Sequence, residues 1–243
     1  MQHRDTHEQL AQMVHEGGRT LPESHDRSAL VCKPVKVEAW RIFRIMSEFI
    51  EGFNVIRHYT LAVTFFGSVR TSPDDPLYKE ANELAARLSK AGFAIVTGGS
   101  AGIMQAANKG AFDLGGASIG LNISLPAAQN YNPYLTDKYL FDHFFVRKVM
   151  LTYASEVYIY FPGGFGTLDE FFEIITLVQI KKIRRIPIVL FGREYWDPLT
   201  GFIEKVLYEK YANIDKEDLE LYKIVDSVDE AYEYVTTHVT CEA

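Results

Sequence analysis

The sequence predicts an α/β protein in which helices cover both faces of a doubly wound, parallel sheet, with a helical extension at the N-terminus. Two observations carry this prediction. Short, continuously apolar runs alternate with amphipathic stretches over residues 60–243, which is typical of parallel strands buried on both faces. Glycine-rich turns at residues 97–102 and 162–166 join two of these runs to the stretches that follow. The length of 243 residues, with 47% hydrophobic residues, suits one large domain with an appendage.

The N-terminal part is predicted to hold a tail and one helix. Residues 1–34 are polar and have too few apolar residues for a periodic face, so we expect a flexible tail. Four histidines of this tail have no metal-ligand pattern around them and are interpreted as solvated: His3, His7, His15 and His25. Over residues 35–59 apolar side chains recur at helical spacing, which predicts a long amphipathic helix that covers the domain or a partner subunit.

The domain over residues 60–243 is predicted to alternate strands with helices. Strands are expected at residues 61–66, 93–96, 117–123, 139–145, 157–161, 186–191 and 222–225. Helices are expected at residues 77–91, 103–114, 167–181 and 194–211, and from residues 147 and 228 onward. Ligands of such folds bind beyond the carboxyl ends of the strands. The loops after Phe66, Val96, Phe145 and Phe161 are therefore the candidate sites.

The strongest motif is Pro-Gly-Gly-Phe-Gly-Thr-Leu-Asp-Glu at residues 162–170. Gly163, Gly164 and Gly166 let a ligand approach the backbone closely, and the N–H groups at the start of the next helix suit a phosphate, to which Thr167 adds a hydroxyl. No Lys-Ser or Lys-Thr follows the glycines, so a Walker A loop is excluded. Thr167-x-x-Glu170 is also the pattern of a capping box, in which Glu170 only satisfies a backbone N–H, and the two interpretations compete for Glu170.

A second glycine loop contains Gly98, Gly99 and Ser100. It lacks the GxGxxG spacing, and no acidic residue follows about 20 positions later, which argues against a dinucleotide but not against a mononucleotide. Such turns also serve tight packing of a strand on a helix. Two glycine loops at one sheet edge indicate a nucleotide site more strongly than either loop alone.

The remaining two loops supply cations. Gly67, Ser68 and Arg70 follow the first strand, where the guanidinium suits bidentate contact with a phosphate but could equally be a solvated side chain. Arg147 and Lys148 stand where a helix is expected to begin, and cations there oppose the helix dipole. An anionic partner would explain the two cations, and Glu170 and a bound phosphate are the candidates.

Charge and cysteine content limit the possible partners and location. The net charge of −7 and the pI near 5.5 argue against nucleic acid or an anionic membrane as the main partner. Cys32 and Cys241 are isolated, which fits a reducing compartment. The N-terminus has no signal-peptide pattern, and no run of about 18 apolar residues occurs. We therefore expect a cytoplasmic protein.

The motifs together resemble those of one family. Phe66-Gly67-Ser68-Val69-Arg70, Gly98-Gly99-x-x-Gly102-Ile103-Met104, Phe144-Phe145-x-Arg147-Lys148 and the 162–170 motif resemble the Lonely Guy family, whose members were long labelled lysine decarboxylases. The resemblance covers residues 36–238 and is to the longer bacterial branch, which has an N-terminal helical extension. It implies a Rossmann-like homodimer that hydrolyses the N-glycosidic bond of AMP or of a cytokinin riboside 5′-monophosphate, releasing the base and ribose 5-phosphate.

The resemblance also implies which residues form the site. Arg147 and Glu170 fall on the catalytic pair. The expected nucleotide-binding residues are Gly67, Ser68, Arg70, Gly98, Gly99, Ser100, Met104, Lys148, Gly163, Gly164, Gly166 and Thr167. No metal and no cofactor is expected, because no residue is marked as a Schiff-base lysine for pyridoxal phosphate. The alternative is a protein that binds or carries a nucleotide without turning it over.

Overall fold

A computed structural model of the chain describes residues 39–125 and 131–239. The predicted tail over residues 1–34 lies outside the described residues. The N-terminal helix α2 spans Ala39–Ile56, within the predicted 35–59, and belongs to the same compact unit as the sheet. None of the described helices combines the length and the apolar character needed to cross a membrane.

The described residues form seven strands in a single sheet. The strands are β1 (Ala62–Phe66), β2 (Ala94–Thr97), β3 (Ser118–Ile123), β4 (Asp137–Phe141), β5 (Val157–Tyr160), β6 (Ile188–Phe191) and β7 (Lys223–Val225). The helices after α2 are α3 (Pro76–Lys90), α4 (Ile103–Phe112), α5 (Phe144–Tyr153), α6 (Phe165–Gln179), α7 (Arg193–Phe202) and α8 (Val228–His238). Alpha-helix α7 continues into the π-helical segment η1 (Ile203–Lys210), and the short 3₁₀ helix η2 (Lys216–Glu220) precedes β7.

All strand pairs are parallel, and the strand order is β4-β3-β2-β1-β5-β6-β7. From β1 the chain first builds the sheet outward through β2, β3 and β4. It then returns to the other side of β1, where β5 pairs with it in the register Val63↔Val157. The order therefore reverses between β1 and β5, and the loops that follow these two strands flank the crevice where doubly wound folds bind ligands. The predicted doubly wound, Rossmann-like sheet is confirmed.

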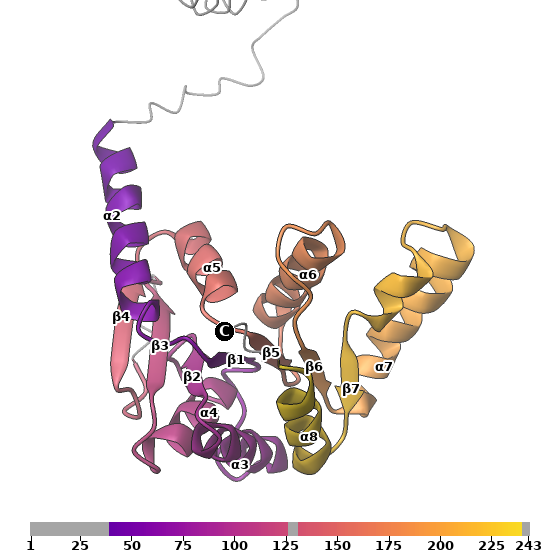
Figure 1. Cartoon of the computed structure of the whole chain (residues 1–243), viewed down its shortest axis with the longest axis horizontal. Coiled ribbons are helices and arrows are strands. Elements are labelled where there is room, and N and C mark those ends of the chain that lie inside the picture. The colour runs from indigo at the N-terminus through magenta and orange to yellow at the C-terminus, as the bar shows by residue number, and fades with distance from the viewer. Residues whose placement is uncertain (1–38, 126–130, 240–243) are drawn as a thin grey trace, which may run out of the picture. The chain divides into compact units, whose positions relative to one another are not determined.

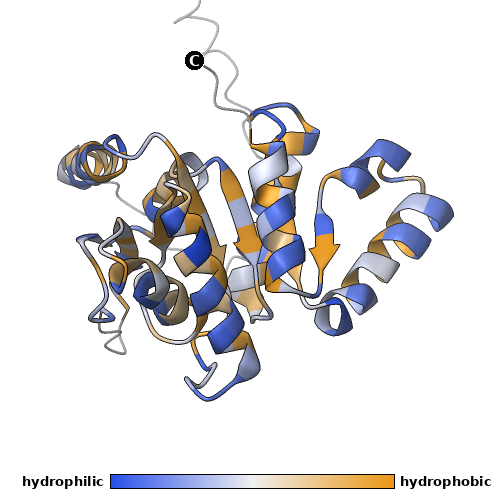
Figure 2. Cartoon of the chain, turned by 60° about the horizontal axis from the view of Figure 1, so that its bottom comes forward, coloured by the Kyte–Doolittle hydropathy of each residue, from blue (hydrophilic) through white to orange (hydrophobic). Residues whose placement is uncertain are grey.

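The two faces of the sheet carry separate cores. In β1, Val63 and Phe65 belong to the core beneath α3, α4 and α8, whereas Phe66 belongs to the core beneath α2, α5, α6 and α7. The same two helix layers lie on opposite sides of the strands in Figure 1. Figure 2 shows apolar strands at the centre and hydrophilic residues along the outer sides of the helices. Because both sheet faces are covered, the strands are continuously apolar and do not alternate apolar with polar residues, as strands with one solvated face do.

One predicted boundary is wrong and matters for the site. The strand expected over residues 139–145 ends at Phe141, and the helix expected from Arg147 begins at Phe144. His143 takes an extended conformation as the N-cap of α5, and its N–H donates to Glu48 Oε2 of α2 at 3.1 Å. A contact 95 residues away in the sequence therefore starts the helix early.

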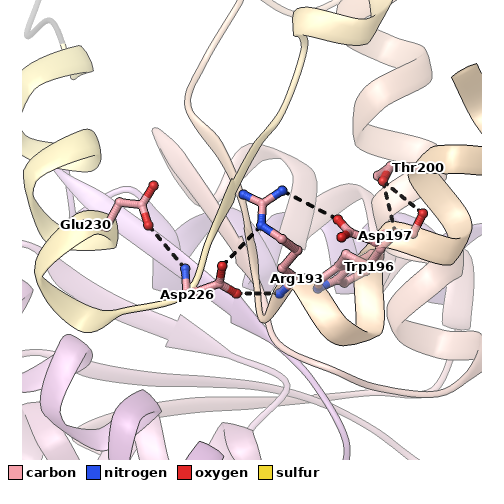
Figure 3. A network of polar contacts seen from close by, with 6 residues as sticks. All are labelled: Arg193, Trp196, Asp197, Thr200, Asp226 and Glu230. Atoms are coloured by element: carbon pink, nitrogen blue, oxygen red, sulfur yellow. Dashed lines mark hydrogen bonds and ion pairs between the residues drawn. The ribbon is translucent and has the colours of Figure 1, made fainter.

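The turns after β6 and β7 are joined by the polar network in Figure 3. Asp226 accepts from the Arg193 backbone N–H at 2.7 Å and from its Nε at 3.2 Å. Glu230 in turn accepts from the Asp226 N–H at 3.2 Å. The N-cap of α7 is Gly192, which has no side chain, so Asp226 supplies the carboxylate that this helix start needs. The network thereby fixes α7, whose Tyr195 reaches the candidate site.

Candidate active site

The carboxyl edge of the sheet holds a cavity of about 810 Å³ at the reversal between β1 and β5. Its size lies within the range of small-molecule sites. Twelve of the fourteen predicted site residues line it: Gly67, Ser68, Arg70, Gly98, Ser100, Met104, Arg147, Gly163, Gly164, Gly166, Thr167 and Glu170. Segments that are up to about a hundred residues apart in the sequence thus meet at one place.

Gly99 and Lys148 are the two predicted residues that do not line the cavity. Gly99 has φ +71°, donates its N–H to Thr97 Oγ1 at 2.8 Å, and lies against the backbone of Gly120. It serves the tight turn and packing on β3. Lys148 Nζ lies 2.7 Å from Asp169 Oδ2 and 3.1 Å from Glu173 Oε2, both on α6. Lys148 thus forms ion pairs with two carboxylates of the neighbouring helix and joins α5 to α6. The sequence predicted a contact with the nucleotide for this residue.

Backbone hydrogen bonds fix the loops of the cavity to one another. The Ser68 N–H donates to the Pro162 carbonyl at 3.0 Å, and the Ile103 N–H donates to the Ser68 carbonyl at 3.0 Å. Gly102, with φ +67°, lies so close to the backbone of Ser68 and Val69 that a Cβ there would be 2.1 Å from the Ser68 carbonyl oxygen. Only glycine fits both the conformation and the space. The walls of the cavity are therefore preorganised.

The start of α6 has features that suit an anion. The helix begins at Phe165 with Gly164 as N-cap, and no side chain of the described residues caps it. A Cβ on Gly164 or Gly166 would meet no atom of the described residues within 4 Å, so these glycines border open space. Gly163 is different, since a Cβ there would lie 2.1 Å from Thr167 Oγ1. Free N–H groups at a helix start, with a hydroxyl beside them, suit a phosphate.

Glu170 lies in the second turn of α6 and not at its start. Because the N-cap is Gly164, the capping-box interpretation of Thr167 and Glu170 is wrong. Glu170 is only 4% exposed, and its side-chain Oε2 has no hydrogen-bond partner among the described residues. Burial raises the pKa of Glu170 to about 7, although Arg147 and Lys148 lower it. A buried carboxylate with a free oxygen and a pKa near neutrality is what proton transfer at neutral pH requires.

Arg147 reaches the cavity from α5 and is held by one backbone carbonyl. Its Nε donates to the Leu121 carbonyl of β3 at 3.0 Å. A Cβ on residue 98 would lie 2.8 Å from its terminal Nη2, which explains why Gly98 has no side chain. Burial lowers the pKa of Arg147, and the charge of Glu170 opposes this effect. The guanidinium thus provides a partly buried positive charge that acts on Glu170.

A buried polar cluster supports the second glycine loop. Asn108 of α4 accepts from Thr97 Oγ1 at 2.6 Å and donates to Ser118 Oγ at 2.9 Å. Asn132 donates from Nδ2 to Asn108 Oδ1 at 2.9 Å and to the Ser100 carbonyl at 3.0 Å. The cluster thereby ties the turn after β2 to β3 and to the segment that precedes β4.

The prediction from sequence missed three polar residues of the cavity, namely Thr71, Asn122 and Tyr195. Asn122, at the end of β3, is 1% exposed, and its Nδ2 has no partner among the described residues. A polar residue in an otherwise apolar run was the available signal. Tyr195 of α7 donates from its hydroxyl to the Gly163 carbonyl at 2.7 Å. No sequence signal marked it, because it comes from a helix far along the chain.

Apolar side chains surround the mouth of the cavity. Val69, Leu125, Phe144 and Phe165 all line it and are all exposed, Phe165 to 93%. Within residues 39–125 and 131–239, no group of three or more His, Cys, Asp or Glu side chains is placed to hold a metal ion. The site thus combines an uncapped helix start, a cation, a buried carboxylate and an apolar rim.

Comparisons with known proteins identify relatives of this chain. The family model described as possible lysine decarboxylase matches residues 104–235. The cytokinin riboside 5′-monophosphate phosphoribohydrolase of Rhodococcoides fascians is 29% identical over 122 residues, which cover 48% of this chain and 61% of that protein. Its counterpart LOG4 of Arabidopsis thaliana is 30% identical over 105 residues, which cover 40% of this chain and 48% of LOG4. The chain thus spans about half the length of these relatives.

Solved structures share the fold over most of the described domain. The structure titled TM1055 is 26% identical, with a TM-score of 0.54, and the match covers 73% of this chain and 94% of that one. The molybdenum cofactor carrier protein of Chlamydomonas reinhardtii is 20% identical, with a TM-score of 0.56, and the match covers 73% and 96%. The family model spans more than half of the chain, including Arg147, Glu170 and the whole 162–170 motif, and the chain accordingly belongs to the Lonely Guy family.

Proposed function

We propose that this protein hydrolyses the N-glycosidic bond of a nucleoside 5′-monophosphate, giving the free base and ribose 5-phosphate. The observation that carries the proposal is Glu170, a buried carboxylate with an unpartnered Oε2 among the described residues, in the second turn of the helix whose start suits a phosphate. The names of the curated relatives support the same reaction.

The chemistry requires a carboxylate near the anomeric carbon. Breaking a ribosyl bond builds positive charge on the sugar, and an ionised carboxylate stabilises that charge and accepts the proton of the attacking water. Glu170 takes this role in the proposal. Arg147 favours the ionised form of Glu170 and orients the nucleotide, while the start of α6 binds the 5′-phosphate away from the reacting bond.

The substrate is proposed to be AMP or a cytokinin riboside 5′-monophosphate. The apolar rim formed by Val69, Leu125, Phe144 and Phe165 can cover the base or an apolar group attached to it. No cofactor takes part in this reaction. Lys148 is engaged by Asp169 and Glu173, which disfavours a role for it as a Schiff-base lysine.

The test is to incubate the pure protein with AMP and to measure adenine and ribose 5-phosphate. Release of both is expected, lost in Glu170→Gln and strongly reduced but still measurable in Arg147→Ala. An isopentenyl adenosine monophosphate run in parallel reports the preference for the base. Binding of nucleoside monophosphates without release of any base would refute the hydrolase and favour the alternative, a nucleotide-binding or carrier protein.

We propose that the protein forms a homodimer through the outer face of α2. Trp40, Phe43, Met46, Ile50 and Phe53 are all exposed on this helix, far more apolar surface than a helix that faces water carries. Light scattering of Phe43→Glu should show a monomer where the unaltered chain shows a dimer; a monomer for the unaltered chain would contradict the proposal. The cytoplasmic location stays a prediction from the sequence.

A further inference from the structure

The inner face of α2 contains one acid, and the proposed reaction has so far given it no role. Glu48 is 6% exposed, although its neighbours on this face, such as Phe49 and Ile56, are apolar. Next to it α2 comes very close to α5, since a Cβ on Gly52 would lie 2.7 Å from Met150. An ionised carboxylate in such a place is costly unless it is well bonded. The hydrogen-bond partners of Glu48 therefore indicate its role.

Both oxygens of Glu48 are bonded to one residue, the N-cap of α5. Oε2 accepts from the His143 backbone N–H at 3.1 Å, and Oε1 lies 2.8 Å from His143 Nδ1, which donates to it when protonated. No side chain from α5 itself caps this helix start within the described residues. A carboxylate at this position bonds a free helix N–H and complements the positive end of the dipole.

The bonded helix start lies one turn before Arg147. The Arg147 N–H donates to the His143 carbonyl at 3.2 Å, so the residue that Glu48 holds is also the first hydrogen-bond acceptor for Arg147. The Arg147 side chain then has little freedom, because its Nε is bonded to Leu121 and its tip lies against Gly98. A shift at the start of α5 must move the guanidinium within the cavity.

We infer that Glu48 is a positioning residue: through His143 it fixes the start of α5 and thereby the place of Arg147 in the active site. The inference rests on the proposed function and gives the N-terminal helix a part in it. Arg44, which bonds Asp142 at 2.6 Å, joins the same two segments, but this pair is half exposed and solvated. The buried Glu48 contact is the one that determines the position of α5.

The effect of Glu48 on chemistry passes through the charges around Glu170. Arg147 and Lys148 favour its ionised form, whereas burial and the neighbours Glu173 and Asp169 oppose it. When Arg147 withdraws, Glu170 keeps only one of its two cations. Its protonated form then persists to higher pH, and the pH at which activity rises moves upward.

The experiment is a double-mutant cycle between Glu48 and Arg147. Glu48→Leu is expected to lower kcat for AMP about tenfold or more, the scale expected for a misplaced catalytic group, and to move the rise of kcat/KM to higher pH. Glu48→Gln, which keeps an acceptor for the His143 N–H, should restore most of the loss. Glu51→Leu, on the exposed side of the same helix, is the matched control and should stay within about twofold of the unaltered chain.

The cycle separates positioning from a general loss of stability. In the Arg147→Ala background, Glu48→Leu should have little further effect, since the two changes then act on one interaction. An equally large effect in that background, or unchanged kinetics in a folded Glu48→Leu protein, would overturn the inference. If Glu48→Leu does not fold, Glu48→Asp, which keeps the charge but shortens its reach, is put through the same cycle.

A second readout keeps this inference separate from the proposed function. If the unaltered chain binds AMP but releases no base, the hydrolase is refuted, and the cycle is then measured on the Kd for AMP by calorimetry. Glu48→Leu should weaken AMP binding as Arg147→Ala does, while the affinity for inorganic phosphate at the start of α6 stays unchanged. Equal loss of affinity for both ligands would overturn the positioning role.

Discussion

Replacing Glu170 by Gln should remove activity and at the same time stabilise the protein, by an amount that depends on pH. The folded-state pKa of about 7 lies above the ordinary value of 4.5, so ionisation of Glu170 favours the unfolded chain. The stability that the neutral form provides is present below about pH 4.5 and is lost as the pH rises to about 7. At 1.36 kcal/mol per pH unit, the difference corresponds to about 3 kcal/mol. Gln is neutral at every pH and avoids this loss.

Urea unfolding of both proteins at several pH values measures this effect. The buried Trp196 provides a fluorescence signal. The stability of Glu170→Gln relative to the unaltered chain should increase by about 2 to 3 kcal/mol between pH 5 and pH 8 and stay level above that. Glu51→Gln, an exposed site, serves as the control and should give a difference below about 0.5 kcal/mol at every pH. A stability difference for Glu170→Gln that does not change with pH would refute the reasoning.

Three further predictions concern turnover of AMP. The kcat/KM should rise with pH through about pH 7, where Glu170 ionises; a rate that is constant from pH 5 to pH 8 would exclude Glu170 as the base. Gly98→Ala places a Cβ 2.8 Å from Arg147 Nη2 and should lower kcat about a hundredfold, with an unchanged circular dichroism spectrum as the check on folding. Tyr195→Phe removes the bond to the Gly163 carbonyl and should raise both KM and the Kd for inorganic phosphate about threefold to tenfold, whereas the exposed Tyr211→Phe should change neither.

The fold could be predicted because parallel strands leave a direct trace in the sequence. The run from Ala62 to Phe66 is buried at every position, and the same holds for β2, β3, β5 and β6. The prediction failed at Phe144 and Phe145, two aromatic residues that favour a strand locally but begin α5. The contact that decides this, Glu48 with His143, joins residues 95 apart. Local preference carries no information about such a contact.

For the site, motifs located the loops but not the direction of each side chain. Lys148 follows Arg147 in the sequence, yet a helix turns adjacent residues by about 100°, so one side chain faces the cavity and the other faces α6. Tyr195 and Glu48 were missed because each bonds to one distant residue from a helix without a motif of its own. Glycine patterns, in contrast, reported backbone geometry faithfully, as at Gly99 and Gly102.

The uncapped start of α6 has a consequence for the energetics of the protein as a whole. Since Gly164 leaves the first N–H groups of this helix without a side-chain partner in the described structure, a phosphate bound there would take the place of the missing cap. Phosphate binding and the ordering of the first turn of α6 would then be thermodynamically coupled, so that each stabilises the other. Amide hydrogen exchange in that turn should therefore slow when phosphate binds. A substitution that adds a side-chain cap to the helix should weaken phosphate binding by the free energy with which the new cap stabilises the helix start.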